Sequence, residues 1–411
     1  MAYYFFVFIF SLTFLVTLFL KRGFDLITIF SFASIFYLYP LIIGHVDNPS
    51  SFGIIEIPKG AYYFFNVYFI FVIVSLFIPF QNAIYSQDFC AFKSIDFKIL
   101  LIIQTALLLL IIAIYPDIFL PSNIDNPSQP SRLGLIYPFF TTFALVLFAV
   151  SLHSKNKIKI SIATVPILLT LTAGSRLYVA LALLIYFLYH FNSRGKFRIA
   201  LDLSSGIKLF LMVFFLLVFK IAYQYLLEGD WSNLISALLE PNNYIYRLLR
   251  GSESNAVVLN FISVFQPQIM QDDSYLYFFF IGLIPFLKRF ILSITNDVHV
   301  SFGDFIQDAL FSDVGYGLAS SFWGQMLYVF DGLPFAFIPL ILYFIFLVFI
   351  NRFYLSGKKL SFFLLPSFCI SIFYYHRWGL GSLIYVFSVN FIAYLLFVAF
   401  KQLLIQKGKG P

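Results

Sequence analysis

Continuous apolar runs of about twenty residues recur along this chain and are separated by short polar joints. Unpaired backbone groups are too costly in lipid, so each such run is expected to cross a bilayer as an α-helix. The 411 residues are 61% hydrophobic and only 11% charged, whereas soluble domains carry about 25% charged residues. Because the runs are continuous rather than alternating, a β-barrel is disfavoured. The sequence therefore predicts an all-α polytopic membrane protein with a single membrane domain, residues 1–411.

We predict about eleven transmembrane helices, with the N-terminus outside and the C-terminus in the cytoplasm. Positive charge gives the orientation, because Lys21 and Arg22 follow the first run and most of the 26 Lys and Arg fall in joints on that side. These joints also account for the net charge of +7, so nucleic-acid binding is not indicated. The first run lacks a basic start and a cleavage site and is read as a retained helix. The crossings cover about residues 2–20, 24–43, 61–80, 99–115, 135–152, 158–172, 177–191, 207–227, 333–350, 360–375 and 383–400.

Residues 228–322, between the eighth and ninth crossings, are predicted to form one large extracytoplasmic loop with short helices. Acids, arginines, asparagines and aromatic residues gather there, as in "EGDWSNLISALLEPNNYIYRLLRGSESN". Residues 275–292 are apolar enough to cross, but a crossing there would move the later basic joints outside. We therefore predict an interfacial or re-entrant helix, broken at Pro285.

Of the arginines at predicted outer positions, against the usual charge bias, four are candidate site residues. Arg176 is in "LTAGSRLYVAL", Arg247 and Arg250 are three residues apart in "NYIYRLLRGSESN", and Arg377 follows His376 in "YYHRWGLGS". A guanidinium is a rigid fork of donors that suits phosphate oxygens. The alternatives are arginines that snorkel to headgroups or pair with nearby acids. A diphosphate clamp is the functional hypothesis.

The remaining candidate site residues are chosen by where they lie in the predicted layout. Lys220 lies within the eighth crossing, where an ionisable residue is a functional candidate or snorkels outward. His299 titrates near neutrality and could act as a base. Tyr316 and Trp323 could stack on sugar rings or belong to the loop core. The candidate bases, each of which could equally be a solvated loop residue, are Glu253, Asp297, His299, Asp304, Asp308 and Asp313.

Several motifs are missing from the sequence. It contains no P-loop, no GxGxxG that opens a helix and no HExxH. Cys90 and Cys369 predict neither a disulfide nor a metal site. We therefore predict no cofactor and no metal, and we expect any reaction to use an activated substrate already in the membrane.

The layout and three stretches of the chain resemble the O-antigen polymerase (Wzy) family of oligosaccharide repeat-unit polymerases. The stretches are "TAGSRLYVAL", "IPFLKR" and "GYGLASSFWGQMLYVFDGLPF", and the likeness in layout covers most of the chain. The third stretch looks like the family's glycine/serine-rich element, which leads through a short helix to a glycine before the next crossing. Many members have Glu where this chain has Gln325, so an acid role is not carried over.

The resemblance implies a membrane glycosyltransferase, similar in fold to the GT-C class, in the bacterial inner membrane. Such enzymes move a glycan from undecaprenyl diphosphate to another lipid-linked repeat unit, and so build O-antigen or capsule. The implied partners are that lipid-linked oligosaccharide as donor and acceptor, membrane lipid and a chain-length regulator protein. We predict catalytic roles for Arg176, Arg250, His299 and Arg377, and substrate contacts for Lys220, Arg247, Glu253, Tyr316, Trp323, Gln325 and His376.

Three alternatives stay open. An O-antigen ligase would share the fold class and the large loop. A flippase or secondary transporter would favour broken helices in two matching halves and short loops, which the chain does not show. A membrane acyltransferase is the third, although no histidine is placed convincingly within a crossing.

Overall fold

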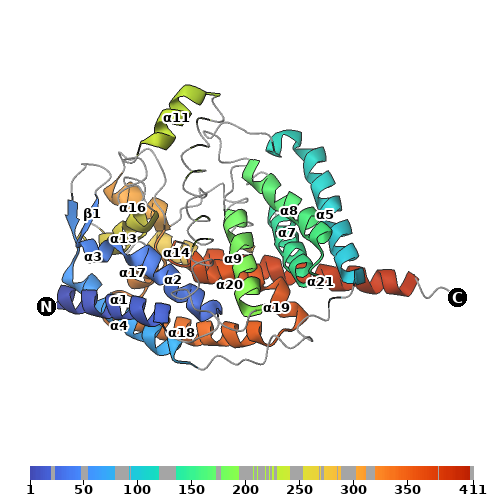
Figure 1. Cartoon of the computed structure of the whole chain (residues 1–411). Helices are drawn as coiled ribbons and strands as arrows, with labels where there is room; N and C mark the ends of the chain where they lie inside the picture. Colours follow the sequence, from blue (N-terminus) through green and yellow to red (C-terminus); the bar gives the residue numbers. More distant parts are fainter. Residues whose placement is uncertain are drawn as a thin grey trace.

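The computed structural model describes residues 1–19, 24–47, 54–78, 92, 94–119, 136–172, 177–193, 207, 211, 218, 222, 225, 229–240, 253–267, 269, 273–284, 286–287, 302–311, 320–377 and 379–407. These residues are mostly helical, as an all-α membrane protein requires. Helix α1 begins and helix α21 ends at opposite ends of the molecule (Figure 1).

Six described helices are long and apolar enough to cross a membrane, and each coincides with a predicted crossing. Three shorter apolar helices are α2 (Leu26–Leu38), α9 (Leu177–Ser193) and α13 (Glu253–Ser263). The predicted eighth crossing falls largely outside the described residues, so a total of eleven stays a prediction. The six long helices are α1 (Ala2–Phe19), α4 (Lys59–Leu76), α5 (Ser94–Ile114), α7 (Ile136–His153), α18 (Leu333–Leu355) and α21 (Leu380–Lys407).

Helices α1, α2, α4 and α18 form one packed group along one side of the molecule (Figure 1). Aromatic rings fill the contact between α1 and α4, where the ring centres of Phe10 and Phe69 are 5.0 Å apart. The buried carboxylate of Asp25 begins α2 by accepting from the Thr28 amide at 3.0 Å. It also accepts from Asn351 Nδ2 at 2.9 Å, which links α2 to α18.

A second group contains α5, α7, α8 (Lys157–Thr172) and α9, with the short 3-10 turn η2 (Pro116–Phe119) after α5. Helix α7 is at its centre and contacts the other three helices. Helix α20 (Leu365–Phe373) joins the two groups, because it contacts α2 and α18 of the first and α7 and α9 of the second. Helix α21 packs against α5, α7, α20 and α19 (Lys359–Phe363).

Joints that we predict on the same side of the membrane lie together. On the predicted cytoplasmic side, the His153 ring is 5.1 Å from Phe362 and 4.9 Å from Tyr189, between ring centres. On the predicted outer side, the rings of Tyr137 and Tyr178 are 6.0 Å apart. The up-and-down alternation is thus consistent with the packing, and which end faces the cytoplasm stays a prediction.

The predicted large loop contains short helices, in part packed into the body. They are α11 (Trp231–Leu239), α13, α14 (Asp273–Gly282) and α16 (Phe302–Leu310). Helix α11 lies apart from the rest in Figure 1, whereas α13 contacts α2 and is buried along most of its length. The ten residues of α14 span about 15 Å, half the thickness of a bilayer core. A crossing by this helix alone is therefore disfavoured.

The structure also contains a small two-stranded sheet, which the all-helical prediction did not include. Strand β1 (His45–Asp47) pairs antiparallel with β2 (Ile54–Glu56), and Val46 lies opposite Ile55. The hairpin follows α3 (Pro40–Ile43) in a predicted outer joint. Asn255 fixes it to α13, since its Oδ1 accepts from the Asp47 amide at 3.2 Å.

Candidate functional site

The candidate site is built on α17 (Phe322–Val329), the short helix within the glycine/serine-rich stretch. Its N-cap is Ser321, whose hydroxyl accepts from the Gly324 amide at 3.2 Å. A Cβ on Gly324 would lie 3.1 Å from the Cα of Phe261, so α13 approaches the backbone of α17 closely. Seven of the eight residues of α17 are buried. The helix is therefore a fixed part of the body.

The chain leaves α17 through Asp331 and Gly332 and enters α18 at Leu333. Gly332 has a φ of 114°, a conformation that L side chains rarely adopt. Pro334 follows in the first turn of α18, where its missing N–H costs nothing. This order of short helix, glycine and long helix is the one that the resemblance implies.

The turn of residues 374–379, between α20 and α21, contacts the start of α17. The Phe322 amide donates to the His376 carbonyl oxygen at 3.2 Å. The indole Nε1 of Trp323 donates to Tyr375 Oη, also at 3.2 Å. Two sequence elements about fifty residues apart thus meet in one place. We call α17 and this turn the α17 site.

Gln325 links the α17 site to two further helices. Its Nε2 donates to Tyr275 Oη on α14 at 2.6 Å, and its Oε1 accepts from the Leu380 amide of α21 at 3.0 Å. A Cβ on Gly379 would lie 2.8 Å from that same Oε1, so a larger residue there would require the Gln325 side chain to shift. Burial raises the pKa of Tyr275, which keeps its phenol neutral. Gln325 therefore positions the start of α21, and its contact with substrate stays a prediction.

A buried chain of hydroxyl groups lies behind the turn. Tyr68 Oη on α4 shares a hydrogen bond with Ser34 Oγ on α2 at 2.6 Å and another with Tyr375 Oη. Tyr68 Oη is also 3.3 Å from His376 Nε2. All four of these residues are 1% exposed or less. This network of neutral groups fixes the turn to α2 and α4.

His376 is not at the surface. Its side chain is fully buried, and its ring lies 5.3 Å from the ring of Tyr37, between centres. Its Nδ1 has no hydrogen-bond partner among the described residues. Burial lowers the pKa of His376 well below its usual range, so the imidazole is neutral at pH 7. We expect this histidine to shape the turn rather than to supply positive charge.

Arg377 follows directly and is half-buried, with its amide donating to the Tyr374 carbonyl oxygen at 2.9 Å. Of the four arginines singled out from the sequence, it alone lies among the described residues. The hydrogen bond to Tyr374 ties the backbone of Arg377 to the end of α20. Arg377 is thus the cation that the described part of the α17 site offers.

The other predicted site residues fall into two groups. Trp323 is 1% exposed, so it could contact a glycan only after its neighbours move. Asp304 is half-buried and Asp308 is exposed on α16, while Glu253 is described only as the first residue of α13. The predictions for Arg176, Lys220, Arg247, Arg250, Asp297, His299, Asp313 and Tyr316, and the break at Pro285, lie outside the described residues.

Sequence reasoning missed Ser34, Tyr68 and Tyr375, which join the turn to the body. A signal was available, because Ser34 and Tyr68 are polar residues deep within predicted crossings. Such residues tend to face protein and pair with each other. Tyr375, the partner of Tyr68 in the turn between α20 and α21, could not be read from a local pattern.

Comparisons of the chain with known protein families, with curated proteins and with solved structures found no match. Any function therefore has to be inferred from the chain's own residues and their arrangement.

Proposed function

We propose that this protein is a membrane glycosyltransferase that polymerises oligosaccharide repeat units linked to undecaprenyl diphosphate, on the outer face of the bacterial inner membrane. The donor and the acceptor are both lipid-linked glycans. The product is a surface polysaccharide of the O-antigen or capsule type, and no cofactor takes part.

One observation carries the proposal: the contact between α17 and the turn of residues 374–379. The glycine/serine-rich stretch bears the resemblance to repeat-unit polymerases, and the turn bears a predicted phosphate-binding arginine. Hydrogen bonds from Phe322 and Trp323 join the two. The resemblance and the arginine hypothesis were reached from separate residues, so their meeting supports a single site.

The chemistry suits this arrangement. The oxygen of an acceptor sugar hydroxyl bonds to the anomeric carbon of the donor, and the bond from that carbon to the diphosphate oxygen breaks. Negative charge builds up on the departing diphosphate, while the hydroxyl proton passes to a base. A guanidinium at Arg377 would stabilise that charge through several N–H donors at once. The described hydroxyl groups and the imidazole of His376 behind the turn are neutral.

Deletion of the gene, followed by sizing of the surface glycan, tests the activity. Single repeat units on the acceptor are expected. Full-length chains left on undecaprenyl diphosphate would instead identify a ligase, and repeat units trapped inside the cell would identify a flippase.

Replacement of Arg377 by Lys tests the site, because it keeps the charge and removes the fork of donors. We expect a rate of polymerisation about 100-fold lower, and therefore short chains, with unchanged protein levels. Arg352→Lys is the matched control, since Arg352 is exposed at the other end of α18 and should behave as the native protein does. Normal chains from Arg377→Lys at normal protein levels would remove Arg377 from the mechanism.

A further inference from the structure

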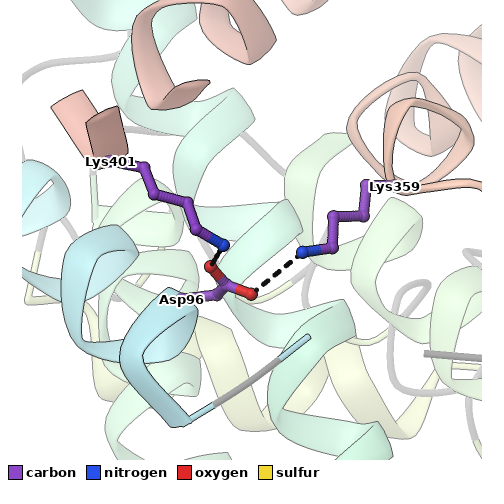
Figure 2. A network of polar contacts seen from close by, with 3 residues as sticks. All are labelled: Asp96, Lys359 and Lys401. Carbon is purple, nitrogen blue, oxygen red and sulfur yellow. Dashed lines mark hydrogen bonds and ion pairs between the residues drawn. The ribbon is translucent and has the colours of Figure 1, made fainter. Parts of the chain in front are cut away.

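A second cluster of charged residues joins three helices at the end of the molecule away from the α17 site. Asp96, in the first turn of α5, is fully buried. Its Oδ2 is 3.3 Å from the Nζ of Lys359 on α19, and its Oδ1 pairs with the Nζ of Lys401 on α21 (Figure 2). Figure 2 shows both lysines pointing toward the carboxylate from opposite sides. We call these three residues the Asp96 cluster.

The charges of the Asp96 cluster do not balance. Among the described residues, one carboxylate faces two ammonium groups, which leaves these three side chains with an excess of one positive charge. Each ammonium has three N–H donors, of which the carboxylate takes only a part. The side chains of Lys359 and Lys401 are 32% and 21% exposed, so donors remain within reach of a ligand. An additional anion would complete the cluster.

The lysines are held in position before any ligand arrives. Asp96, in the first turn of α5, is an anion at a helix N-terminus, which the helix dipole favours. The Nζ of Lys359 lies 5.5 Å from the ring centre of Phe92, and that of Lys401 lies 6.0 Å from Phe397. Binding therefore requires little ordering of flexible side chains.

Apolar surface lies next to the cluster on the same helices. Ile95 is 45% exposed on α5, and Phe400 and Leu404 are 42% and 39% exposed on α21. Both helices are among those long and apolar enough to cross a membrane. A ligand there meets the N–H donors of Lys359 and Lys401 and hydrocarbon-like side chains beside them. That combination matches a lipid rather than a free ion.

We propose that the Asp96 cluster binds the headgroup phosphate of an anionic membrane phospholipid, whose acyl chains lie against α5 and α21. The phosphate oxygens accept from Lys359 and Lys401, while Asp96 holds the two ammonium groups in place. This site is independent of the glycosyltransferase proposal and lies on other residues.

The full-length protein in mixed micelles tests the site. The probes are phosphatidylglycerol, phosphatidylcholine and inorganic phosphate, and the readouts are the thermal unfolding midpoint and the bound lipid seen by native mass spectrometry. Phosphatidylglycerol is expected to bind and to raise the midpoint, and the other two probes are not. Lys359→Gln and Lys401→Gln should each weaken phosphatidylglycerol binding about fivefold.

Matched variants separate a lipid site from a purely structural cluster. Lys358→Gln removes an exposed neighbouring charge and should leave binding nearly unchanged. Asp96→Asn should lower the midpoint without lipid yet retain or strengthen binding, because both lysine charges remain. Lys401→Arg should also bind, and it replaces Lys401→Gln if that variant does not fold.

Three results would overturn the proposal. If both lysine-to-glutamine variants bind phosphatidylglycerol as tightly as the native protein does, the Asp96 cluster is a structural link only. If Lys358→Gln loses as much binding as they do, the attraction is diffuse, and if inorganic phosphate raises the unfolding midpoint as much as phosphatidylglycerol does, the site binds a free ion.

Discussion

The α17 site and the Asp96 cluster both join segments that are far apart in the sequence, but they do so with different chemistry. The α17 site uses uncharged partners such as Tyr68, Tyr375 and Trp323, all 1% exposed or less. The Asp96 cluster uses full charges, and its two lysines reach the surface. The difference follows the cost of desolvation, which is several kcal/mol for a buried ion and much less for a hydrogen-bonded neutral group.

The contrast suggests a division of roles. Neutral hydrogen bonds can hold a turn rigidly inside the body without attracting ions to it. The half-buried Arg377 then presents its charge from a fixed backbone. Charged side chains that are partly exposed, such as Lys359 and Lys401, can hold helices together and still be within reach of an anion. Four predictions test this contrast, from the largest expected effect to the smallest.

Trp323→Ala should have the largest effect, because it removes a buried ring that contacts Phe64, Phe322 and Tyr375. We expect a loss of about 3–5 kcal/mol in the free energy of unfolding. Trp231→Ala is the matched control, since that ring is 63% exposed on α11, and its effect should stay within about 0.5 kcal/mol. Thermal unfolding of the purified protein measures both, and similar losses would show that burial does not distinguish the two rings.

Asp96→Asn comes next, because it leaves two ammonium groups without their carboxylate. The expected loss is about 2 kcal/mol at low salt. High salt should reduce the difference from the native protein, since the partly exposed lysines are screened. Asp308→Asn, at an exposed acid on α16, serves as control. A loss that does not change with salt would argue against the charged character assigned to this cluster.

The neutral state of His376 makes a prediction about pH. Its pKa is lowered in the folded protein, whereas an unfolded histidine has a pKa of about 6.5. Below that pH the unfolded state takes up a proton that the folded state does not, so stability falls by about 1.4 kcal/mol per pH unit. His376→Gln should remove this part of the slope between about pH 6.5 and 5. Unfolding at several pH values checks this, and an unchanged slope would mean that His376 titrates normally.

Tyr375→Phe should have the smallest effect of the four. It removes one hydroxyl and leaves Trp323 Nε1 and Tyr68 Oη each short of a partner. We expect a loss of about 1 kcal/mol that does not depend on salt, in contrast to Asp96→Asn. Tyr63→Phe, at a ring 58% exposed on α4, is the matched control and should be close to neutral. A loss from Tyr375→Phe that high salt removes would contradict the neutral character of the α17 site.

Much of the helical layout could be predicted from the sequence. Where the observed helices differ from the predicted crossings, the cause is local and is chiefly proline. The predicted second crossing is divided because Pro40 begins α3 after α2 ends at Leu38. The predicted tenth is divided at Leu364, where Pro366 lies in the first turn of α20. These prolines are visible in the sequence, but whether a proline bends a helix or divides it depends on its neighbours.

The candidate site was predicted less completely. The sequence alone singled out two candidate segments: the turn with His376 and Arg377, and the stretch with Trp323 and Gln325. The partners of these residues did not, and neither did the burial of His376. Burial of a polar side chain depends on which helices surround it, and the hydrophobic pattern of one segment does not contain that information.

The sequence by itself determined that this chain is built of apolar helices bounded by charged joints. The reason is local, because every backbone group within lipid must find its partner inside the same helix. Only the tertiary structure decided which joints meet. Asp96 pairs with lysines 263 and 305 residues away, and Tyr68 with a tyrosine 307 residues away. Such pairs depend on how side chains from several helices fit together, and no single segment specifies that fit.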